Sequence, residues 1–327
     1  MSPVNVRVLL AITSALAVIL SVGDLASQEP ALKWYKGNLH THTINSDGDS
    51  APDAVARWYK EHRYNFLALT DHNYRTDPQG LAPMFEARDR FLLISGEEVT
   101  SGYRDIPVHV NAFGGQTTIG PAFGESVVGT VQRNVDRIRQ EGAVPSLNHP
   151  LYRWAIDAEI LRQVRGLGLF EIYNGHPATN DEWGLEAIWD TALTAGRKLY
   201  GIAVDDAHYF KRIGPDLSNP GRGWIEVKAP ELTEEALLAA IGRGDFYAST
   251  GVRLAELERG PTGVELRVEQ VGDEKYRTRF IGSDGQILDE VVGPEAKYRL
   301  RSDDGYVRAA IVDSAGRRAW IQPVFVD

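Results

Sequence analysis

Short apolar runs alternate with amphipathic stretches between about residues 36 and 210. The runs read NLHTH, FLALTDH, FLLISGEE, VHVNAFG, AVPSLNHP, LFEIYNG and YGIAVDDAH. Between most of them, apolar residues recur with the 3.6-residue period of an amphipathic helix, at 51–59, 127–138, 160–164 and 183–196. Seven strands that alternate with helices are expected to pair in parallel. The pattern therefore predicts an α/β fold, either a barrel or a doubly wound sheet.

The pattern changes after residue 220. One helix is predicted at 233–241, and from Leu254 onward apolar and polar residues alternate between turns such as GSDGQ, SDDG and DSAGR. This alternation predicts a small C-terminal antiparallel β-sandwich domain at 254–327. We expect a first domain at 31–215 and a helical connector at 216–253 that packs on it.

The first 27 residues have the features of a signal peptide. Arg7 and the amino terminus supply positive charge before the 15-residue apolar run Val8–Val22. A membrane span needs about 20 apolar residues, so we expect cleavage between Gly23 and Ser27 and no stable membrane span afterwards; a permanent anchor is the alternative. The sequence thus predicts an exported protein, periplasmic or secreted.

Charge and cysteine content narrow the chemistry. The formal net charge is −10 and no basic stripe is visible, so we expect no binding to a nucleic-acid polymer. The chain has no cysteine, which leaves nitrogen and oxygen as the ligands of any metal. Neither a G-x-S-x-G elbow nor a P-loop pattern occurs. A nucleophilic triad and a tightly held nucleotide cofactor are therefore disfavoured.

Polar residues gather at the carboxyl ends of the predicted strands, where α/β proteins build their active sites. They are His40, His42, Asp71, His72, Glu97, Glu98, His149, Asn174, Asp206 and His208, with His109 inside the fourth run. The nine candidate metal ligands are His40, His42, Asp47, His72, Glu98, His109, His149, Asp206 and His208. A catalytic zinc uses about three protein ligands, so nine suggest two or three divalent ions, with zinc, manganese or iron suited to this ligand set.

Three neighbouring residues receive other roles. Asp71 is expected to hydrogen-bond an imidazole and fix its tautomer. His62 follows the helical period and is expected to be a solvated helix end. His176, in YNGHP, is expected to be a turn residue rather than part of the site rim.

The motifs HTHTINSDG, LTDHN, GEEVT, VHVNAFG, NHP, EIYNG and DDAH resemble, in their order, those of the PHP (polymerase and histidinol phosphatase) superfamily. The resemblance covers about residues 34–212. The later segment GWIEVKAPELTEEALLAAIGRGDFYASTG is similar, more loosely, to the exported branch grouped with CehA/McbA-type metallohydrolases. The resemblance implies a distorted seven-stranded β/α barrel of the PHP type, followed here by the β-sandwich domain.

The resemblance also implies how the ligands divide. His40, His42 and Asp206 would hold a first metal, Glu98 would bridge it to a second, and His109 and His149 would complete the second. His72, His208 and the residue after the H-x-H turn would form a third position. Many members have histidine there, whereas this chain has Asp47, so two and three metals both remain open. Asp71, Glu98 and His208 are the predicted catalytic residues.

The predicted reaction is hydrolysis of a small anionic phosphate ester by a metal-bridged hydroxide. Arg75, Arg104 and Arg153, in loops after strand ends, and Asn174 are the candidate substrate residues. One alternative is a metal-dependent carbamate, ester or amide hydrolase, for which the aromatic loop LYRWAI would suit an aryl group. A second is an exported metal- or ligand-binding protein without turnover.

Overall fold

The computed structural model describes residues 31–87, 90–179 and 182–326, so the predicted signal peptide lies outside the described residues. Leu32–Asp327 form one compact unit. Within the described ranges, no helix is long and apolar enough to cross a membrane. The predicted domain boundaries at 215 and 253 remain predictions.

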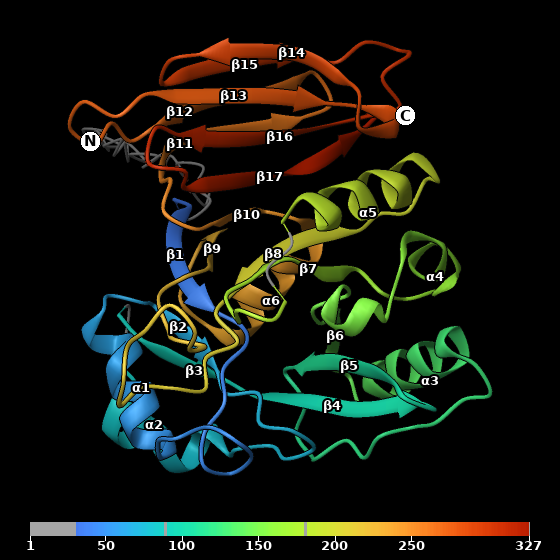
Figure 1. The fold of residues 1–327 in the computed structure, drawn as a ribbon. Helices are drawn as coiled ribbons and strands as arrows, with labels where there is room; N and C mark the ends of the chain where they lie inside the picture. The colour runs from blue at the N-terminus through green and yellow to red at the C-terminus, as the bar shows by residue number, and fades with distance from the viewer. Residues whose placement is uncertain (1–30, 88–89, 180–181, 327) are drawn as a thin grey trace, which may run out of the picture. The chain divides into compact units, whose positions relative to one another are not determined.

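Six α-helices are described, and the four predicted in the first domain all form. They are α1 (Pro52–Glu61), α2 (Pro78–Phe85), α3 (Val127–Gln140), α4 (Ala158–Gln163), α5 (Glu182–Thr194) and α6 (Glu234–Arg243). In α1 and α3 the apolar stripe is buried: Val55 and Tyr59 in the first, Val131, Val135 and Ile138 in the second. The helical period therefore identified the faces that pack on the sheets (Figure 1).

The strands of the first part of the chain are shorter than the apolar runs that predict them. They are β1 (Lys33–Asn38), β2 (Phe66–Ala68), β3 (Leu92–Ile94), β4 (Gly96–Tyr103), β5 (Ile106–Phe113), β6 (Val144–Leu147), β7 (Leu169–Asn174) and β8 (Tyr200–Val204). Most end before the polar residues of their motifs. The candidate ligands His40, His42, His72, Asp206 and His208 thus lie on the segments that leave the strands.

The predicted closed barrel is not found among the described strands. β1, β2 and β3 pair in parallel inside a nine-stranded sheet, and β4–β8 form a separate five-stranded sheet. The sheets approach each other through isolated parallel bridges, Thr41 with Ala207 and His72 with Glu98. Both bridges involve residues in or beside the candidate ligand set, so the place where the two sheets meet is also where the polar strand ends gather.

The single run FLLISGEE becomes two strands because the chain changes sheet at Ser95. Gly96 begins β4 where a side chain would not fit: a Cβ there would lie 2.7 Å from the carbonyl oxygen of Leu69. β4 then pairs antiparallel with β5, and β5 with β6. The prediction of parallel pairing is wrong for these strands. A two-residue turn, in which Arg104 has φ 55°, joins β4 to β5 with no intervening helix.

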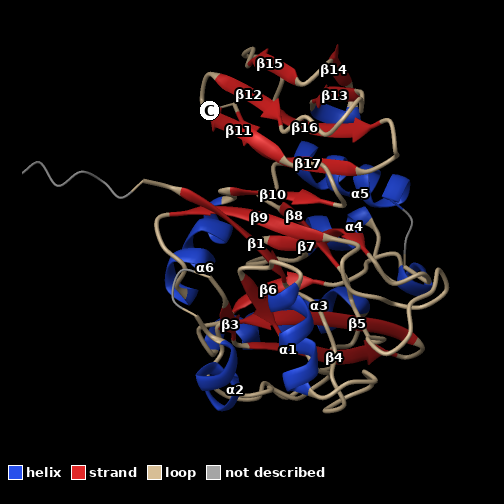
Figure 2. Cartoon of the chain, turned by 90° about the vertical axis from the view of Figure 1, so that its left-hand side faces the viewer, coloured by secondary structure: helices blue, strands red, loops and turns tan. Residues whose placement is uncertain are grey.

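The segment predicted as a helical connector contains α6 but also two strands, β9 (Trp224–Ala229) and β10 (Phe246–Ser249). β9 pairs antiparallel with β1 and with β10, as Figure 2 shows. β10 in turn pairs with β17, the last strand. The connector therefore continues the main sheet instead of only covering it.

A separate C-terminal β-sandwich is not confirmed. The remaining strands are β11 (Leu254–Gly260), β12 (Gly263–Val268), β13 (Tyr276–Ile281), β14 (Ile287–Val292), β15 (Glu295–Arg299), β16 (Tyr306–Asp313) and β17 (Arg318–Phe325). β11, β12 and β15 form a three-stranded sheet, whereas β13, β14, β16 and β17 extend the nine-stranded sheet. Leu257 and Leu266 of the small sheet share a core with Phe280 and Ile311 of the large one. One of the two layers thus belongs to the sheet that also contains β1.

Candidate metal centre

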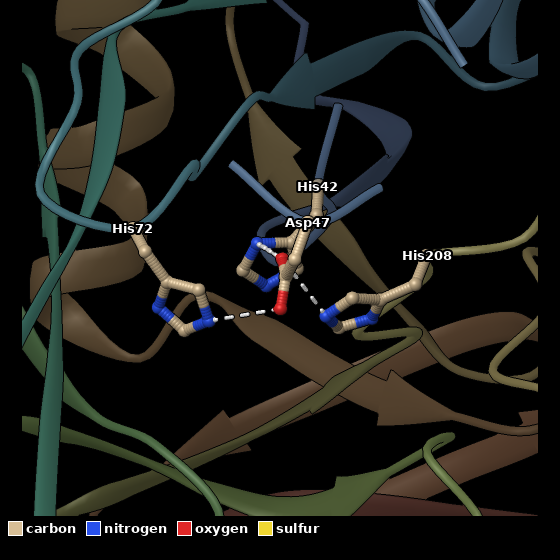
Figure 3. Close-up of side chains that lie close together, drawn as sticks. All are labelled: His42, Asp47, His72 and His208. Carbon is tan, nitrogen blue, oxygen red and sulfur yellow. Dashed lines mark ion pairs between the residues drawn. The ribbon is translucent and has the colours of Figure 1, made fainter. Parts of the chain in front are cut away.

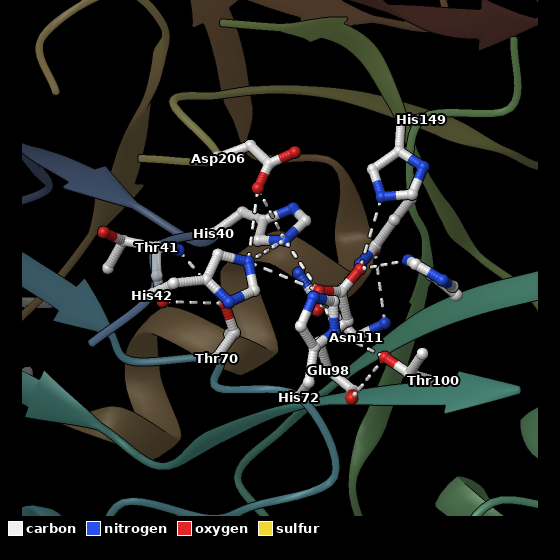
Figure 4. Close-up of polar contacts among 12 residues, drawn as sticks. His40, Thr41, His42, Thr70, His72, Glu98, Thr100, Asn111, His149 and Asp206 are labelled. Carbon is white, nitrogen blue, oxygen red and sulfur yellow. Dashed lines mark hydrogen bonds and ion pairs between the residues drawn. The ribbon is translucent and has the colours of Figure 1, made fainter. Parts of the chain in front are cut away.

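The segment that follows β1 is held extended by its neighbours. The His40 amide donates to the Asn38 side chain over 2.8 Å, and the His42 amide donates to the Ala207 carbonyl over 2.9 Å. The Thr41 amide donates to the Thr70 hydroxyl over 3.0 Å. These bonds fix the backbone on both sides, so the two imidazoles leave it in set directions (Figure 4).

Four ligand atoms converge between the two sheets. His40 Nε2 and His42 Nε2 lie 3.1 Å apart, and both lie 3.3 Å from Glu98 Oε2. Asp206 Oδ1 is 3.4 Å from His40 Nε2 and 3.2 Å from His42 Nε2. Ligands at about 2.0–2.1 Å from a tetrahedral ion are about 3.3–3.4 Å from one another. We call these four residues the buried group. The spacing of its His40, His42 and Asp206 atoms fits the ligand shell of one metal ion, and Glu98 Oε2 approaches the same two nitrogens.

Glu98 connects the buried group to two further imidazoles. Its Oε2 atom faces His40 and His42, whereas its Oε1 atom lies 3.0 Å from His109 Nδ1 and 3.3 Å from His149 Nε2. Oε2 is buried and, among the described residues, accepts no hydrogen bond of good geometry, although His72 Nδ1 lies 2.9 Å away as an ion pair. An unsatisfied buried carboxylate oxygen among imidazole nitrogens is unfavourable without a cation. The geometry therefore fits a metal at Oε2 and a second at Oε1.

Asp47 gathers a third set of nitrogens (Figure 3). Its Oδ1 atom lies 3.4 Å from His42 Nδ1 and 3.3 Å from His208 Nε2, and its Oδ2 atom lies 3.5 Å from His72 Nε2. These four residues, which we call the Asp47 group, bring their ligand atoms within 4.8 Å of one another. The structure thus places Asp47 with His72 and His208, the set in which the resemblance put it, and adds His42.

In three histidines Nδ1 has an oxygen partner that leaves Nε2 free, although in His72 the Nδ1 atom also lies 2.9 Å from Glu98 Oε2. His40 Nδ1 lies 2.6 Å from Glu171 Oε1, His72 Nδ1 lies 2.6 Å from Thr100 Oγ1, and His208 Nδ1 lies 2.9 Å from the Asp206 carbonyl oxygen. An oxygen acceptor at Nδ1 keeps the proton there and leaves the Nε2 lone pair for a metal, which is the usual role of such outer partners.

Glu171 was missed by the sequence prediction. It lies on β7, every residue of which is buried, and its second oxygen accepts from the His149 amide over 2.6 Å and from Asn174 Nδ2 over 2.8 Å. A glutamate inside an otherwise apolar buried strand needs a partner. That pattern, LFEIYNG, was the available signal. Asn148 on the preceding strand end is a second omission: its amide donates to Glu98 Oε1 over 2.8 Å.

Asp71, a predicted catalytic residue, holds the loop that follows His42. Its carboxylate accepts hydrogen bonds from the Thr43 amide over 2.7 Å, from Ser46 Oγ over 2.9 Å and from Thr76 Oγ1 over 2.7 Å. Ser46 Oγ is in turn 3.3 Å from His42 Nδ1. The structure thus places Asp71 beneath the loop that carries Asp47, one hydroxyl away from an imidazole.

The backbone is strained at two candidate ligands. His149 has φ 23° and Asp206 has φ 50°, values that side-chain-bearing residues rarely adopt. The Asp206 amide donates to the His40 carbonyl oxygen over 3.0 Å. The Asp206 carbonyl oxygen accepts a hydrogen bond from the Ser218 hydroxyl. Strain that the surrounding bonds maintain is typical of functional sites.

Burial and neighbouring charges act in opposite directions on the carboxylates. Burial raises the pKa of Glu98, but the imidazoles of His40, His109 and His72 outweigh it and hold that pKa well below its usual range. Burial likewise raises the pKa of Asp206, and the histidines around it lower the pKa well below the usual value. Both groups are therefore anionic and available to a cation at neutral pH.

The histidines differ among themselves. Burial, followed by the neighbouring His208, lowers the pKa of His42 to about 4. Burial lowers the pKa of His72 as well, but Glu98 and Asp47 outweigh it and raise that pKa to about 10. For His40 burial is outweighed by Asp206, Glu98 and Glu171, so its pKa is well above 6.5. Without metal, protons balance the carboxylates of the site.

A cavity of about 130 Å³ opens onto the ligands. Seven of the residues that line it are candidate ligands, and the others are Tyr152, His176 and Thr179. His176 is thus on the cavity wall as well as on a turn, contrary to the expectation from YNGHP. His62, by contrast, stacks on Trp58 with ring centroids 3.7 Å apart, and its Nδ1 donates to the Trp58 carbonyl oxygen over 2.7 Å at the exposed end of α1.

The predicted substrate residues lie outside the cavity lining. Arg75 donates from Nε to Ser95 Oγ over 2.7 Å, and Arg104 and Arg153 are exposed turn residues with φ near 55°. Asn174 donates to Asp206 Oδ2 over 3.1 Å, so it supports a candidate ligand. Loop position alone did not reveal where these long side chains point.

No protein-family model and no curated protein sequence matches the chain. Among solved structures, a two-domain protein from Bacteroides vulgatus that contains a predicted PHP-like metal-dependent phosphoesterase is 17% identical, with a TM-score of 0.52. That match covers 91% of this chain and 90% of the other.

Two further matches are weaker. A metal-dependent phosphoesterase structure from Bifidobacterium adolescentis is 16% identical over 56% of this chain and 89% of its own, with a TM-score of 0.42. An amidohydrolase from Chromobacterium violaceum with bound SO4 is 15% identical over 56% of this chain and 90% of its own, with a TM-score of 0.38. The match to the two-domain protein of Bacteroides vulgatus, over 91% of this chain, shows a shared fold.

Proposed function

We propose that the protein is a metal-dependent hydrolase and that phosphate esters are its substrates. The observation that carries the proposal is the convergence on His40 Nε2 and His42 Nε2 of Asp206 Oδ1 and Glu98 Oε2, each 3.2–3.4 Å from both nitrogens, while Glu98 Oε1 is directed at two further imidazoles. The similarity of fold to a PHP-like metal-dependent phosphoesterase supports the same reaction class.

The contacts between the residues indicate which of them would bind each metal ion. His40, His42 and Asp206 would hold one ion and His109 with His149 a second, with Glu98 shared between them. A third ion, if present, would be held by the Asp47 group. When bound, such ions lower the pKa of a water molecule toward 7 and neutralise charge on the attacked group. The protein's own part is to fix the ligands, through Glu171, Asn148 and the loops described above.

The charge of the site favours an anionic substrate. Asp47, Glu98 and Asp206 supply three carboxylates, fewer than the positive charges of two or three divalent ions. Glu171 adds a fourth carboxylate, which is buried; when it is counted, a two-metal centre becomes neutral and a three-metal centre stays positive. An anionic phosphate group is therefore attracted to the site although the whole chain is acidic.

One observation favours a second candidate, hydrolysis of a carbamate, ester or amide. The described residues that line the cavity include no arginine or lysine to grip a phosphate. The loop after His149 instead presents Trp154, whose side chain is 78% exposed. An uncharged carbonyl substrate with an aryl group would suit these features. This candidate corresponds to the CehA/McbA-like branch.

Export remains part of the proposal and is supported by the sequence of residues 1–27. A purified protein lacking that segment should be loaded with zinc, manganese or iron. It should then be assayed on p-nitrophenyl phosphate mono- and diesters beside naphthyl carbamates and acetates.

Turnover of the phosphate esters, abolished in Glu98→Gln and retained in His62→Gln, is the expected result. Activity only on the carbonyl substrates would establish the second candidate. Metal binding with no turnover of either class would indicate a binding protein.

A further inference from the structure

Three residues that line the metal cavity belong to none of the candidate ligand groups: Tyr152, His176 and Thr179. None of them carries a permanent charge. After the ligands are occupied, these side chains are the protein groups left to contact a substrate. His176 stands out because an imidazole offers a hydrogen bond of fixed direction.

The turn that carries His176 is fastened to the ligands. Asn174 Oδ1 accepts from the His176 amide and from Thr179 Oγ1, each over 2.8 Å. The Nδ2 atom of the same side chain donates to Glu171 Oε2 over 2.8 Å and to Asp206 Oδ2 over 3.1 Å. One side-chain amide therefore positions both a candidate metal ligand and the cavity wall, so the turn that carries the imidazole is held in place relative to Asp206.

The tautomer of His176 follows from its own turn. The Ala178 amide donates to His176 Nδ1 over 3.1 Å. A nitrogen that accepts a hydrogen bond carries no proton, so the neutral ring holds its proton on Nε2. The ring lies edge-on to His208, with centroids 5.7 Å apart. The second ring nitrogen, Nε2, is thus a donor and not a metal-binding lone pair.

We propose that His176 is a substrate-binding residue whose Nε2–H donates a hydrogen bond to an oxygen of the phosphoryl group. The assignment rests on the proposed function and deepens it. A neutral donor on the wall, with no guanidinium in the lining, accounts for how a phosphate can be oriented by the protein itself. Because Nε2–H is the group presented, His176 does not add to the metal-ligand set.

The first test is the tautomer, which needs no activity. Two-dimensional ¹⁵N–¹H spectra of the metal-free protein at neutral pH distinguish the ring nitrogens, and His176→Gln identifies the signal. We expect a neutral ring protonated at Nε2. A ring protonated at Nδ1 would overturn the proposal, because Nε2 would then be an acceptor.

The second test measures binding of inorganic phosphate to the metal-loaded protein by calorimetry. His176→Phe should weaken binding about 10- to 100-fold, the usual value of a hydrogen bond to a charged group, without loss of metal. His176→Gln retains an amide donor and should recover part of the affinity. His62→Phe, at the exposed end of α1, is the matched control and should bind as the wild type does.

The outcomes separate the two proposals. Phosphate binding that is equal in wild type and His176→Phe would overturn the role of His176 and leave the phosphoesterase proposal standing. A metal-loaded wild type that binds no phosphate would contradict the phosphoesterase proposal itself. Loss of metal from His176→Phe would show that the residue is a ligand, and would overturn the assignment as a substrate donor.

Discussion

The buried group and the Asp47 group are built from the same residue types but are supported very differently. In the buried group the side chains of His40, Glu98 and Asp206 are 0%, 1% and 6% exposed. In the Asp47 group the side chain of Asp47 is 53% exposed and that of His72 is 27% exposed. A site enclosed by protein holds its ligands in place before the metal arrives, whereas an exposed carboxylate must be ordered by the metal.

The supporting hydrogen bonds differ in the same way. Glu171, inside β7, orients His40, and Asn148, directly after β6, orients Glu98; both strands belong to the five-stranded sheet. Asp47 stands in the loop after His42, where its described side-chain hydrogen bond comes from the adjacent Ser46 over 3.3 Å. We therefore expect a tightly held metal in the buried group and a weaker, exchangeable one in the Asp47 group.

The largest effect is expected for Glu98→Gln. Its two oxygens face both sides of the centre, and an amide replaces one of them with a donor that repels a cation. Metal affinity should fall by more than the 10- to 100-fold typical of an outer partner, and turnover should be abolished. Metal content and activity after desalting are the measurements.

His149→Ala should also abolish turnover, because it removes an imidazole on the Oε1 side of Glu98. His62→Ala is the control and should be nearly silent. An inactive His62 variant would contradict the set of residues assigned to the metal centre. A Glu98→Gln protein with full metal content would contradict it as well.

Glu171→Gln comes next, because it keeps the shape of an outer partner and removes its charge. The imidazole of His40 should lose its fixed tautomer, and metal affinity should fall about 10- to 100-fold. Competition with a fluorescent chelator measures the affinity. Unchanged affinity would mean that burial alone, and not the bond to Glu171, holds the imidazole in place.

Asp47→Asn tests the weaker region alone. The buried group should keep its metal, because none of its ligand atoms comes from the loop. A three-metal centre predicts the loss of one equivalent and a two-metal centre predicts no loss, as determined by elemental analysis. Release of all the metal by this substitution would contradict the separation of the two groups.

The smallest effect is a difference in pH dependence. A histidine whose metal-free pKa is raised holds a proton at neutral pH, and a metal must displace it, so affinity falls as the pH is lowered. His72, with a pKa of about 10, and His208, whose pKa is also raised because Asp47 and Asp206 outweigh burial, both belong to the Asp47 group.

In the buried group only the pKa of His40 is raised, while the pKa of His42 is about 4. Each displaced proton changes affinity about tenfold per pH unit. On dialysis from pH 8 toward pH 6, the Asp47 group should lose metal first. Earlier loss from the buried group would reverse the comparison.

The sequence predicted which side chains would gather at one place better than it predicted the sheets that carry them. His40, Glu98, His149 and Asp206 could be found because each follows or ends an apolar run, and strand ends of parallel segments meet at one edge. The sheet topology could not be read in the same way. A single glycine, Gly96, turns one apolar run into two strands of different sheets, and nothing in the periodicity marks it.

The residues around the ligands were harder to predict. Glu171 contacts His40, a residue far away in the chain, and His176 is positioned by one short turn. Hydrophobic periodicity describes neither kind of contact. The arginines illustrate the opposite error: Arg75 follows a strand end, yet its side chain is bound to Ser95 and the Gly115 carbonyl. The sequence shows which strand a loop residue follows, but it does not determine where the side chain of that residue points.

We propose that the converging nitrogens and carboxylates between the two sheets hold a multinuclear metal centre. Elemental analysis of the purified protein, without the first 27 residues and after exhaustive dialysis, tests it most directly. The account predicts at least two equivalents of zinc, manganese or iron for each chain, reduced in Glu98→Gln. Fewer than one equivalent of tightly bound divalent metal would contradict it.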